Sequence, residues 1–299
     1  MKKMIFLAIF AVLTLVTSVT TFASPLETLM GLAVGEVAEV PIIMYHALED
    51  TPDNRWEITS EDFESDLKYI KENGFVPVVM QDLIDFVHDG KQLPEKPIVL
   101  SFDDGRMPTM DIILPMLEKY DARITMAIIG RETDRYTEID KEGKVSRHPH
   151  MTWNEVIEAC KSGRVEIQSH TYDLHGKNGA KKISGENENA YRERLLADLH
   201  KFAKILYGHT GIIPNTLAYP LGAISDSSDS IIKDAGYLAS LSCQQKSNII
   251  RVGDADCLFS LNRFLRPPHQ SSLEFFAKLG DGKMMNDTDS KLNIVKPKT

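Results

Sequence analysis

The sequence contains only three cysteines, Cys160, Cys243 and Cys257, among 299 residues. An odd number leaves at least one thiol unpaired within the chain, which excludes a dense framework of disulfides. None of the three has the close spacing of a zinc knuckle. Cys160 falls on the apolar side of a predicted helix and is expected to be a small buried residue. Whether Cys243 and Cys257 pair is left open by the sequence.

Basic residues are scarce relative to acidic ones, since 34 lysines and arginines face 43 aspartates and glutamates, giving a formal net charge of −9. This balance argues against a general nucleic-acid binder, which usually carries a basic patch. Binding of a neutral sugar polymer does not require a particular net charge of the protein. The hydrophobic share of 42% and the charged share of 26% are those of an ordinary globular protein.

Long hydrophobic runs are absent except at the N-terminus, where residues 4–16 are apolar and follow the basic pair Lys2-Lys3. Thr21-Phe22-Ala23 is a plausible cleavage site, so residues 1–23 are predicted to be the signal peptide of a secreted or cell-surface protein. An uncleaved anchor is the alternative, but the run is shorter than the roughly 20 residues of a membrane span. No transmembrane segment is expected after cleavage.

Strand and helix patterns alternate through residues 40–279, which are predicted to form one domain between a lead at 24–39 and a polar tail at 280–299. Alternation of this kind predicts parallel strands covered by helices, and it fits both a doubly wound sheet and a barrel. The expected strands cover residues 40–45, 75–79, 97–102, 124–129, 165–167, 216–219, 237–242 and 259–264. The expected helices lie between Thr59 and Gly74 and over 83–88, 112–117, 153–160, 189–207 and 272–279. Residues 131–150 and 176–188 are expected to be loops over the site.

Two adjacent carboxylates, Asp103 and Asp104, follow the strand pattern of residues 97–102 and precede Gly105. Side chains alternate along a strand, so the two neighbours are expected to point in different directions. One carboxylate could then hold a metal ion while the other stays free for proton transfer. Such a pair taken alone is more often found in a turn or a helix cap.

Two imidazoles, His170 and His175, follow another apolar strand pattern at residues 165–167. Active sites of α/β barrels lie at the C-terminal ends of the strands, so both pairs are expected at one edge. One carboxylate and two imidazoles form a metal site with open positions, and zinc in such a site lowers the pKa of a water to about 7. Co²⁺, Ni²⁺ or Fe²⁺ would also accept these ligands.

At these residues the chain resembles a known family. The stretch SFDDG at 101–105 is similar to the [ST]-F-D-D-G motif of the polysaccharide deacetylases, carbohydrate esterase family 4. The stretch ending in His170-Thr171-Tyr172-Asp173-Leu174-His175 resembles the second motif, with one residue more between the histidines than usual. This longer spacing is similar to the branch that deacetylates poly-N-acetylglucosamine of biofilm exopolysaccharides. Further similarities lie at 42–46, 219–222 and 231–237, so the resemblance spans about residues 40–277.

The resemblance implies a distorted (β/α) barrel of about seven strands and a role for each matching residue. Asp104, His170 and His175 would bind the metal ion, for which zinc is the first expectation. Asp103 would be the general base that takes a proton from the attacking water. The backbone N–H of Leu221 would stabilise the oxyanion, because Pro220 has no N–H to offer.

The chain departs from the family pattern at two places. The arginine that usually precedes the third motif is missing, and Arg263 or Arg266 could replace it; an unrelated salt bridge is the alternative for both. The late motif contains no histidine, but Met44-Tyr45-His46 matches the early segment that carries the acid in the permuted exopolysaccharide branch. His46 is therefore the expected general acid. Tyr172 and Tyr219 could stack on a sugar ring or pack within the barrel.

The sequence as a whole predicts an exported, metal-dependent enzyme that hydrolyses the acetamide groups of N-acetylglucosamine units in a polysaccharide. Poly-β-1,6-N-acetylglucosamine is the first substrate expected, and peptidoglycan or chitooligosaccharides are the alternatives. A glycan-binding module without turnover and an amidase of non-sugar substrates also remain open. The linkage, the native metal and the oligomeric state are not decided by the sequence.

Overall fold

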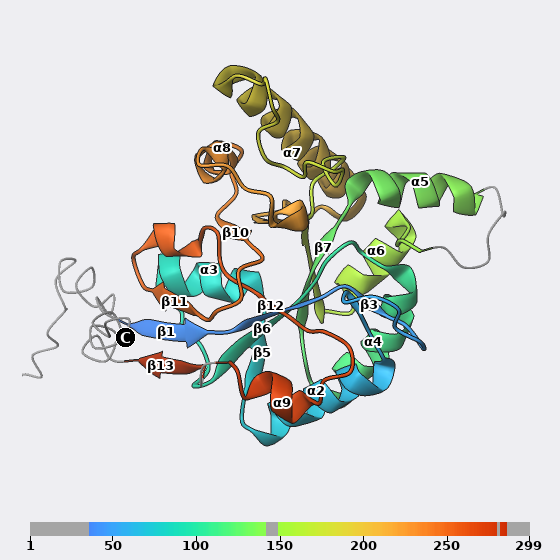
Figure 1. Ribbon diagram of the computed structural model, residues 1–299, viewed down its shortest axis with the longest axis vertical. Helices are drawn as coiled ribbons and strands as arrows, with labels where there is room; N and C mark the ends of the chain where they lie inside the picture. Colours follow the sequence, from blue (N-terminus) through green and yellow to red (C-terminus); the bar gives the residue numbers. More distant parts are fainter. Residues whose placement is uncertain (1–35, 142–148, 280–281, 286–299) are drawn as a thin grey trace, which may run out of the picture. The chain divides into compact units, whose positions relative to one another are not determined.

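A parallel β-sheet forms the centre of the computed structural model, which describes residues 36–141, 149–279 and 282–285. Seven strands follow one path in the order β10-β9-β8-β7-β6-β2-β12, and β5 adds beside β6 (Figure 1). Every pair in this sheet is parallel. The strands are β2 (Ile42–Tyr45), β5 (Val76–Val78), β6 (Pro97–Phe102), β7 (Ile124–Ile128), β8 (Val165–Ser169), β9 (Thr216–Ala218), β10 (Ala239–Leu241) and β12 (Phe264–Leu265).

The sheet curls into an incomplete barrel, as predicted. Its first edge, β10, reaches the segment before β12 through a single isolated bridge between Leu241 and Leu261. Two backbone hydrogen bonds support that bridge, from Leu261 N–H to Ser240 O and from Ser242 N–H to Leu261 O. The two ends of the strand path are therefore joined at one point and not along a ladder.

Helices cover the outside of the sheet in a row in which α9, α2, α4, α6, α7 and α8 each contact the next. Helix α2 begins just after Thr59, as expected, because Thr59 and Asp62 form a reciprocal capping box. It buries Phe63, Leu67 and Ile70 on one face. The helices are α2 (Ser60–Glu72), α3 (Met80–Asp89), α4 (Met107–Tyr120), α5 (Gly130–Lys141), α6 (Trp153–Lys161), α7 (Glu188–Thr210), α8 (Ser228–Asp234) and α9 (Ser272–Phe276). Among the described residues, no helix combines the length and apolarity needed to cross a membrane.

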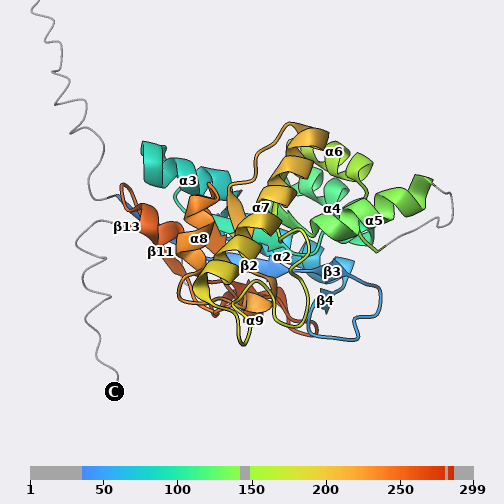
Figure 2. The same ribbon diagram turned by 90° about the horizontal axis from the view of Figure 1, so that it is seen from above.

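A second, antiparallel sheet joins β1 (Val37–Val40) to β11 (Asn248–Arg251) and β13 (Lys283–Met285). It lies with α3 on the opposite side of the main sheet from α4 and α6 (Figures 1 and 2). This pairing extends the folded part of the chain beyond the predicted limits of 40 and 279. Short strands that pair only with distant segments leave no local signal in the sequence. The predicted signal peptide lies outside the described residues.

Two predicted elements are wrong. Residues 130–141 form helix α5 where a loop was expected, because this polar helix buries only Gly130 and Thr133 and lacks an apolar stripe. The strand expected at 259–264 is reduced to Phe264–Leu265, since Ser260 adopts a left-handed backbone with φ 54°.

Candidate active site

Four strands deliver the predicted residues to one edge of the sheet. His46 follows β2, Asp103 and Asp104 follow β6, His170 follows β8, and Leu221 lies three residues beyond β9. Because these strands are parallel, their C-terminal ends meet at the same edge. The structure gathers these residues and His175 around one cavity of about 250 Å³. Trp56, Arg106 and Cys243, which the sequence did not single out, also line it.

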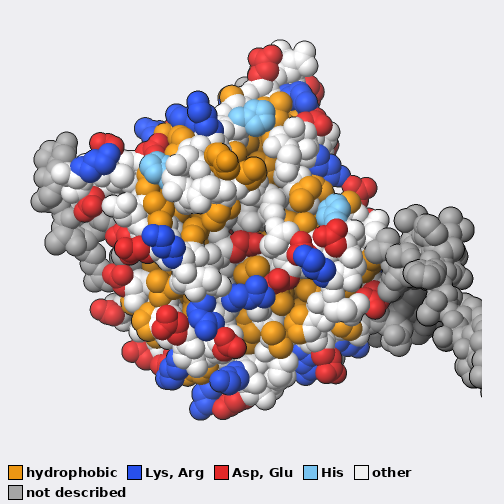
Figure 3. Space-filling model, turned by 180° about the vertical axis from the view of Figure 1, so that it is seen from behind, with side chains coloured by type: hydrophobic (Ala, Val, Ile, Leu, Met, Phe, Trp, Pro, Cys, Tyr) orange, Lys and Arg blue, Asp and Glu red, His pale blue; other side chains and the backbone are white. Residues whose placement is uncertain are grey.

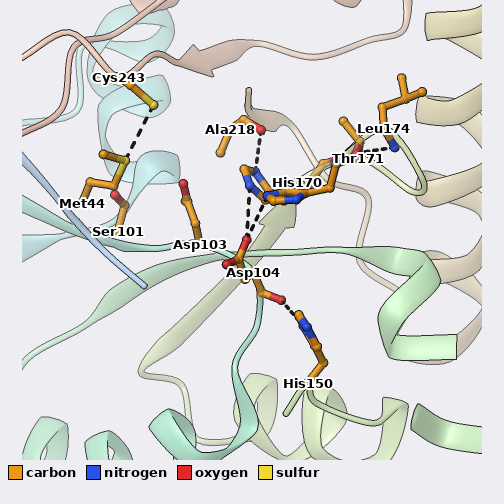
Figure 4. Close-up of polar contacts among 12 residues, drawn as sticks. Met44, Ser101, Asp103, Asp104, His150, His170, Thr171, Leu174, Ala218 and Cys243 are labelled. Atoms are coloured by element: carbon orange, nitrogen blue, oxygen red, sulfur yellow. Dashed lines mark hydrogen bonds and ion pairs between the residues drawn. The ribbon is translucent and has the colours of Figure 1, made fainter. Parts of the chain in front are cut away.

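The directions of Asp103 and Asp104 are set by a turn. Strand β6 ends at Phe102, and the Asp103 N–H still donates to Tyr45 O at 3.0 Å. Asp104 then turns into the left-handed region with φ 72°, which aspartate tolerates better than most residues. The two carboxylates therefore point apart (Figure 4), but the cause is this turn and not the alternation expected from the sequence.

Asp104, His170 and His175 form a compact group whose potential ligand atoms lie within 4.8 Å of one another. Nε2 of His175 is 3.2 Å from Asp104 Oδ1, and Nε2 of His170 is 3.6 Å from the same oxygen. Thr171 between the histidines has φ 71°, which is strained for a β-branched residue. Strain of this kind clusters at functional sites.

The chemistry of this group fits a divalent metal ion. His170 Nδ1 lies 2.8 Å from Ala218 O, which can only accept, so Nδ1 carries the proton and Nε2 presents a lone pair towards Asp104 (Figure 4). Burial alone would raise the pKa of Asp104, but His175 and His170 outweigh it and lower the pKa. An ionised carboxylate thus faces an imidazole lone pair, and a cation between them satisfies both.

Asp103 is held by Arg263. The guanidinium donates two hydrogen bonds, from Nη1 to Oδ1 at 2.7 Å and from Nη2 to Oδ2 at 2.9 Å, and both side chains are buried. A third bond, from Arg263 Nε to Ser242 O at 2.8 Å, fixes the guanidinium. Burial alone would raise the pKa of Asp103, but Arg263 and His170 lower it, so the carboxylate is ionised.

Arg266 plays no part at this cavity. Its guanidinium pairs with the buried Asp66 at 2.8 and 3.1 Å, and Tyr45 and Ser272 donate to the same carboxylate. This network links Arg266, which follows β12, and Ser272 of α9 to Asp66 of helix α2. Of the two candidate arginines, Arg263 therefore contacts Asp103, and Arg266 forms the unrelated salt bridge.

His46 is held in the cavity by packing. Its ring lies 4.7 Å from the Trp56 indole, and among the described residues its buried Nδ1 has no hydrogen-bond partner. Burial lowers the pKa of His46, and the carboxylates of Asp103 and Asp104 oppose this only in part. The resting imidazole is therefore mainly neutral at neutral pH. Trp56 lies ten residues beyond His46 in the sequence, and no motif or spacing marks it as part of the site.

Leu221 occupies a tight turn, η1 (Pro220–Gly222), in the left-handed region with φ 60°. In the described part of the chain its N–H donates to no other residue, whereas Gly222 N–H donates to Tyr219 O at 3.0 Å. The Leu221 side chain is 58% exposed and lines the cavity. A backbone donor is thus available at the predicted position.

For Tyr219 and Tyr172 the sequence left open whether they stack on a sugar or pack within the barrel, and in this structure both pack against the protein. Tyr219 is fully buried and donates to Asp229 at 2.9 Å. Tyr172 donates to Asp134 at 2.8 Å, and the Lys201 ammonium lies 3.8 Å from the centre of its ring. Neither tyrosine lines the cavity. Both residues follow strand ends, but the Tyr219 side chain turns into the interior, and the partly buried Tyr172 side chain contacts α5 and α7.

All three cysteines are free, which answers the question of pairing. Cys243 lies at the wall of the cavity, with its sulfur 3.8 Å from Met44 Sδ (Figure 4). The same sulfur is 3.8 Å from Arg263 Nη2. Burial raises the pKa of this thiol, which keeps it protonated. Cys243 therefore acts here as a packing residue behind the Asp103–Arg263 pair.

Comparison with known proteins gives consistent matches. Similar proteins include poly-beta-1,6-N-acetyl-D-glucosamine N-deacetylases of Escherichia coli (strain K12), 27% identical over 219 residues, and of Staphylococcus aureus (strain MSSA476), 26% identical over 196 residues. The matches cover 65% and 64% of this chain. They cover 32% and 63% of the relatives, so this chain spans about a third of the first and under two thirds of the second.

Solved structures share the fold. A Streptococcus pyogenes deacetylase in complex with acetate has a TM-score of 0.66 at 20% identity, covering 81% of this chain and 98% of that one. A de-N-acetylase from Aggregatibacter actinomycetemcomitans has a TM-score of 0.62 at 25% identity, covering 76% and 94%. A family model described as polysaccharide deacetylase matches residues 90–240, slightly more than half of the chain, including Asp103, Asp104, His170 and His175. The chain therefore belongs to the polysaccharide deacetylase family of enzymes.

Proposed function

We propose that this protein removes acetyl groups from N-acetylglucosamine units of a polysaccharide and releases acetate. One observation carries the proposal: a buried, ionised Asp103 held by Arg263 shares a cavity with the Asp104–His170–His175 group. A general base beside a metal-binding group is the arrangement needed for hydrolysis of an amide.

The positions of the residues assign each of them a role in the reaction. Asp104, His170 and His175 would hold a divalent ion, which would supply Lewis acidity to an amide carbonyl and to a water. Asp103 accepts the proton of the attacking water. The Leu221 N–H donates to the carbonyl oxygen as its negative charge grows. The C–N bond then breaks, and a proton reaches the leaving nitrogen.

His46 is the proposed donor of that last proton. It lines the same cavity, and its resting imidazole is neutral, so it first takes up the proton that Asp103 removed from the attacking water. Because burial lowers the pKa of His46, the imidazolium so formed gives that proton readily to the leaving nitrogen. The products are acetate and a free amine on the sugar. No other described histidine lines the cavity apart from His170 and His175.

The proposed substrate is poly-β-1,6-N-acetylglucosamine, and the proposed location is outside the cytoplasm. The substrate rests on the relatives named above and on the spacing of His170 and His175. The location rests on residues 1–23. Zinc is the proposed metal because neutral imidazole and carboxylate suit it.

The test is acetate release from poly-β-1,6-N-acetylglucosamine, chitooligosaccharides and peptidoglycan, with Zn²⁺ or Co²⁺ added. We expect the first polymer to be deacetylated with the highest kcat/KM. A higher kcat/KM on either alternative would replace the substrate. Retention of a glycan without acetate release from any of the three would establish a binding module instead of an enzyme.

A further inference from the structure

The two histidines of the metal-binding group are held in different ways. His170 directly follows strand β8, and its ring donates to Ala218 O at 2.8 Å. His175 comes after a loop of four residues, 171–174, and its side chain is 32% exposed. The position of the His175 ring therefore depends on the conformation of this loop.

Helix α5 binds the backbone carbonyls at the start of the loop. Gly130 N–H donates to Thr171 O at 3.1 Å, and Arg131 N–H donates to Tyr172 O at 2.8 Å. Thr171 needs such support, because strained backbone persists only where the surrounding structure fixes it. These two bonds satisfy carbonyls, so the N–H groups of the loop must be paired elsewhere.

Asp198 of helix α7 binds the two central N–H groups of the loop. Its Oδ1 accepts from Tyr172 N–H at 2.7 Å, and its Oδ2 accepts from Asp173 N–H at 2.8 Å. The two outer N–H groups donate to the hydroxyl groups of Ser169 and Thr171, the second of which is shown in Figure 4. With Asp198 all four N–H groups are paired, and a bond to a carboxylate is roughly twice as strong as one between neutral groups.

The carboxylate of Asp198 is not needed to attach helix α7. This helix packs through a mainly apolar face, whose buried side chains are Tyr191, Leu195, Leu199, Phe202 and Leu206. Acidic side chains are scattered over the surface, as the face in Figure 3 shows, and substitution of such exposed residues usually changes stability little. Asp198 instead turns a partly buried carboxylate to the loop, where it accepts both of its hydrogen bonds within the described residues.

We propose that Asp198 is a positioning residue of the metal centre, which holds the loop so that Nε2 of His175 faces Asp104. These two groups are 3.2 Å apart, and a shift of the loop would move the His175 ring away while His170 stayed in place. Asp198 does not line the cavity, so it acts through the loop. The proposal rests on the proposed function, which assigns His175 to the metal ion, and adds a residue that sets the affinity for that ion.

The test measures the Zn²⁺ dissociation constant of the wild type and three variants by competition with a chelator. Asp198→Asn keeps the size of the side chain but leaves one acceptor oxygen instead of two, and Asp198→Ala leaves none. We expect Asp198→Asn to weaken Zn²⁺ binding about tenfold and Asp198→Ala about 100-fold, the range found for groups that support metal ligands. Glu193→Gln is the matched control, because Glu193 is an exposed carboxylate on the same helix, and its Zn²⁺ affinity should equal that of the wild type.

A second measurement reports on the ligands directly. The visible absorption of bound Co²⁺ depends on the number and geometry of its ligands. The spectrum should change in both Asp198 variants and stay unchanged in Glu193→Gln. Circular dichroism and thermal denaturation of the metal-free proteins check the fold, and if Asp198→Ala does not fold, Asp198→Asn decides alone.

The outcomes separate this proposal from the proposed function. A lower Tm of metal-free Asp198→Asn, together with the wild-type Zn²⁺ affinity and Co²⁺ spectrum, would show that Asp198 only stabilises the fold and would overturn the proposal. The same weakening of Zn²⁺ binding in Glu193→Gln would also overturn it. Failure of the metal-loaded wild type to release acetate, with the metal affinities as expected, would overturn the proposed function and leave the role of Asp198 in place.

Discussion

Arg263 and Asp103 form a bidentate pair in which neither side chain is more than 3% exposed, although 160 residues separate them. Two parallel N–H···O bonds fix the plane of the carboxylate as well as its charge. Removing one partner of such a pair leaves an uncompensated buried charge, which costs about 3–5 kcal/mol. The pair therefore determines both the orientation of the proposed base and the stability of the fold around it.

We predict that Arg263→Gln lowers the free energy of unfolding by about 3–5 kcal/mol. The double variant Asp103→Asn, Arg263→Gln should lose less free energy of unfolding than the single variant, because it leaves no unpaired buried charge. Urea denaturation of the wild type, the single variant and the double variant measures both losses. Arg164→Gln is the control, because Arg164 pairs with the exposed Asp121, and surface pairs contribute about 0–1 kcal/mol. Equal losses in Arg263→Gln and Arg164→Gln would contradict the role of the buried pair.

The geometry of the metal-binding group leads to a separate prediction about Asp103 and Asp104. Asp104→Asn, His170→Ala and His175→Ala should each lose tight metal binding, because each removes a ligand atom from the group. Asp103→Asn should keep the metal and lose most turnover. Elemental analysis of the purified variants, with circular dichroism as the check on folding, measures this. If Asp103→Asn were the variant that lost its metal, the roles of the two aspartates would have to be exchanged.

The sequence predicted the part of the site that depends on local pattern. Asp103, Asp104, His170 and His175 each follow a recognisable strand, and parallel strands bring those ends together. The choice between Arg263 and Arg266 could not be made, because it depends on how far a long side chain reaches through the interior.

Other features depend on packing between distant segments. Trp56 and Arg106 lie in loops, where spacing carries no periodic signal, so their place at the cavity could not be predicted. Helix α5 was missed because its faces are polar, and β1 and β13 because each is stabilised only by a partner far along the chain. The packing of Tyr219 could not be decided from the sequence, because a strand end does not show which way the next side chain turns.

Glu186 gives a pH-dependent prediction for the segment that follows His175. Arg194 donates to it at 2.7 and 2.9 Å and Ile183 N–H at 3.0 Å, which lowers the pKa of Glu186 from 4.5 to about 2. Because the pKa of Glu186 is lower in the folded than in the unfolded protein, its ionised carboxylate stabilises the fold at pH values above about 4.5. This stabilisation is lost as the pH falls from about 4.5 towards 2.

Glu186→Gln should therefore be less stable than the wild type at pH 7, and the difference should shrink as the pH is lowered through this range. Urea unfolding at several pH values measures the difference. Glu138→Gln serves as the exposed control. A difference between Glu186→Gln and wild type that stays constant from pH 7 to pH 3 would show that this carboxylate does not titrate as stated.

Export is predicted from residues 1–23. In a host with a functional secretion pathway, the mature protein should begin near Ser24, because Thr21-Phe22-Ala23 matches the small-residue cleavage pattern. N-terminal sequencing of the protein recovered outside the cytoplasm measures this. Recovery of residues 1–20 still attached, in the membrane fraction, would favour an uncleaved anchor.

The last prediction concerns His46, the proposed acid, and Trp56, whose ring packs against it. His46→Ala should retain its metal and fold but lose roughly 10²–10⁴-fold in kcat, the usual share of general acid–base catalysis. Trp56→Ala should lose roughly three- to tenfold in kcat, since a contact between two rings contributes about 0.5–1.5 kcal/mol. Steady-state kinetics on the polymer measures both variants.

The double variant shows whether Trp56 acts through His46 or touches the substrate itself. The two rings are 4.7 Å apart, and packing is the contact that orients the imidazole, so removing Trp56 should have no further effect once His46 is gone. Trp56→Phe, which keeps a ring in place, should restore most of the kcat lost in Trp56→Ala. If the losses of the two single variants instead multiplied in the double variant, Trp56 would act on the sugar directly. Near wild-type kcat in His46→Ala would remove His46 from the proposed mechanism, and with it the strongest link to the exopolysaccharide branch.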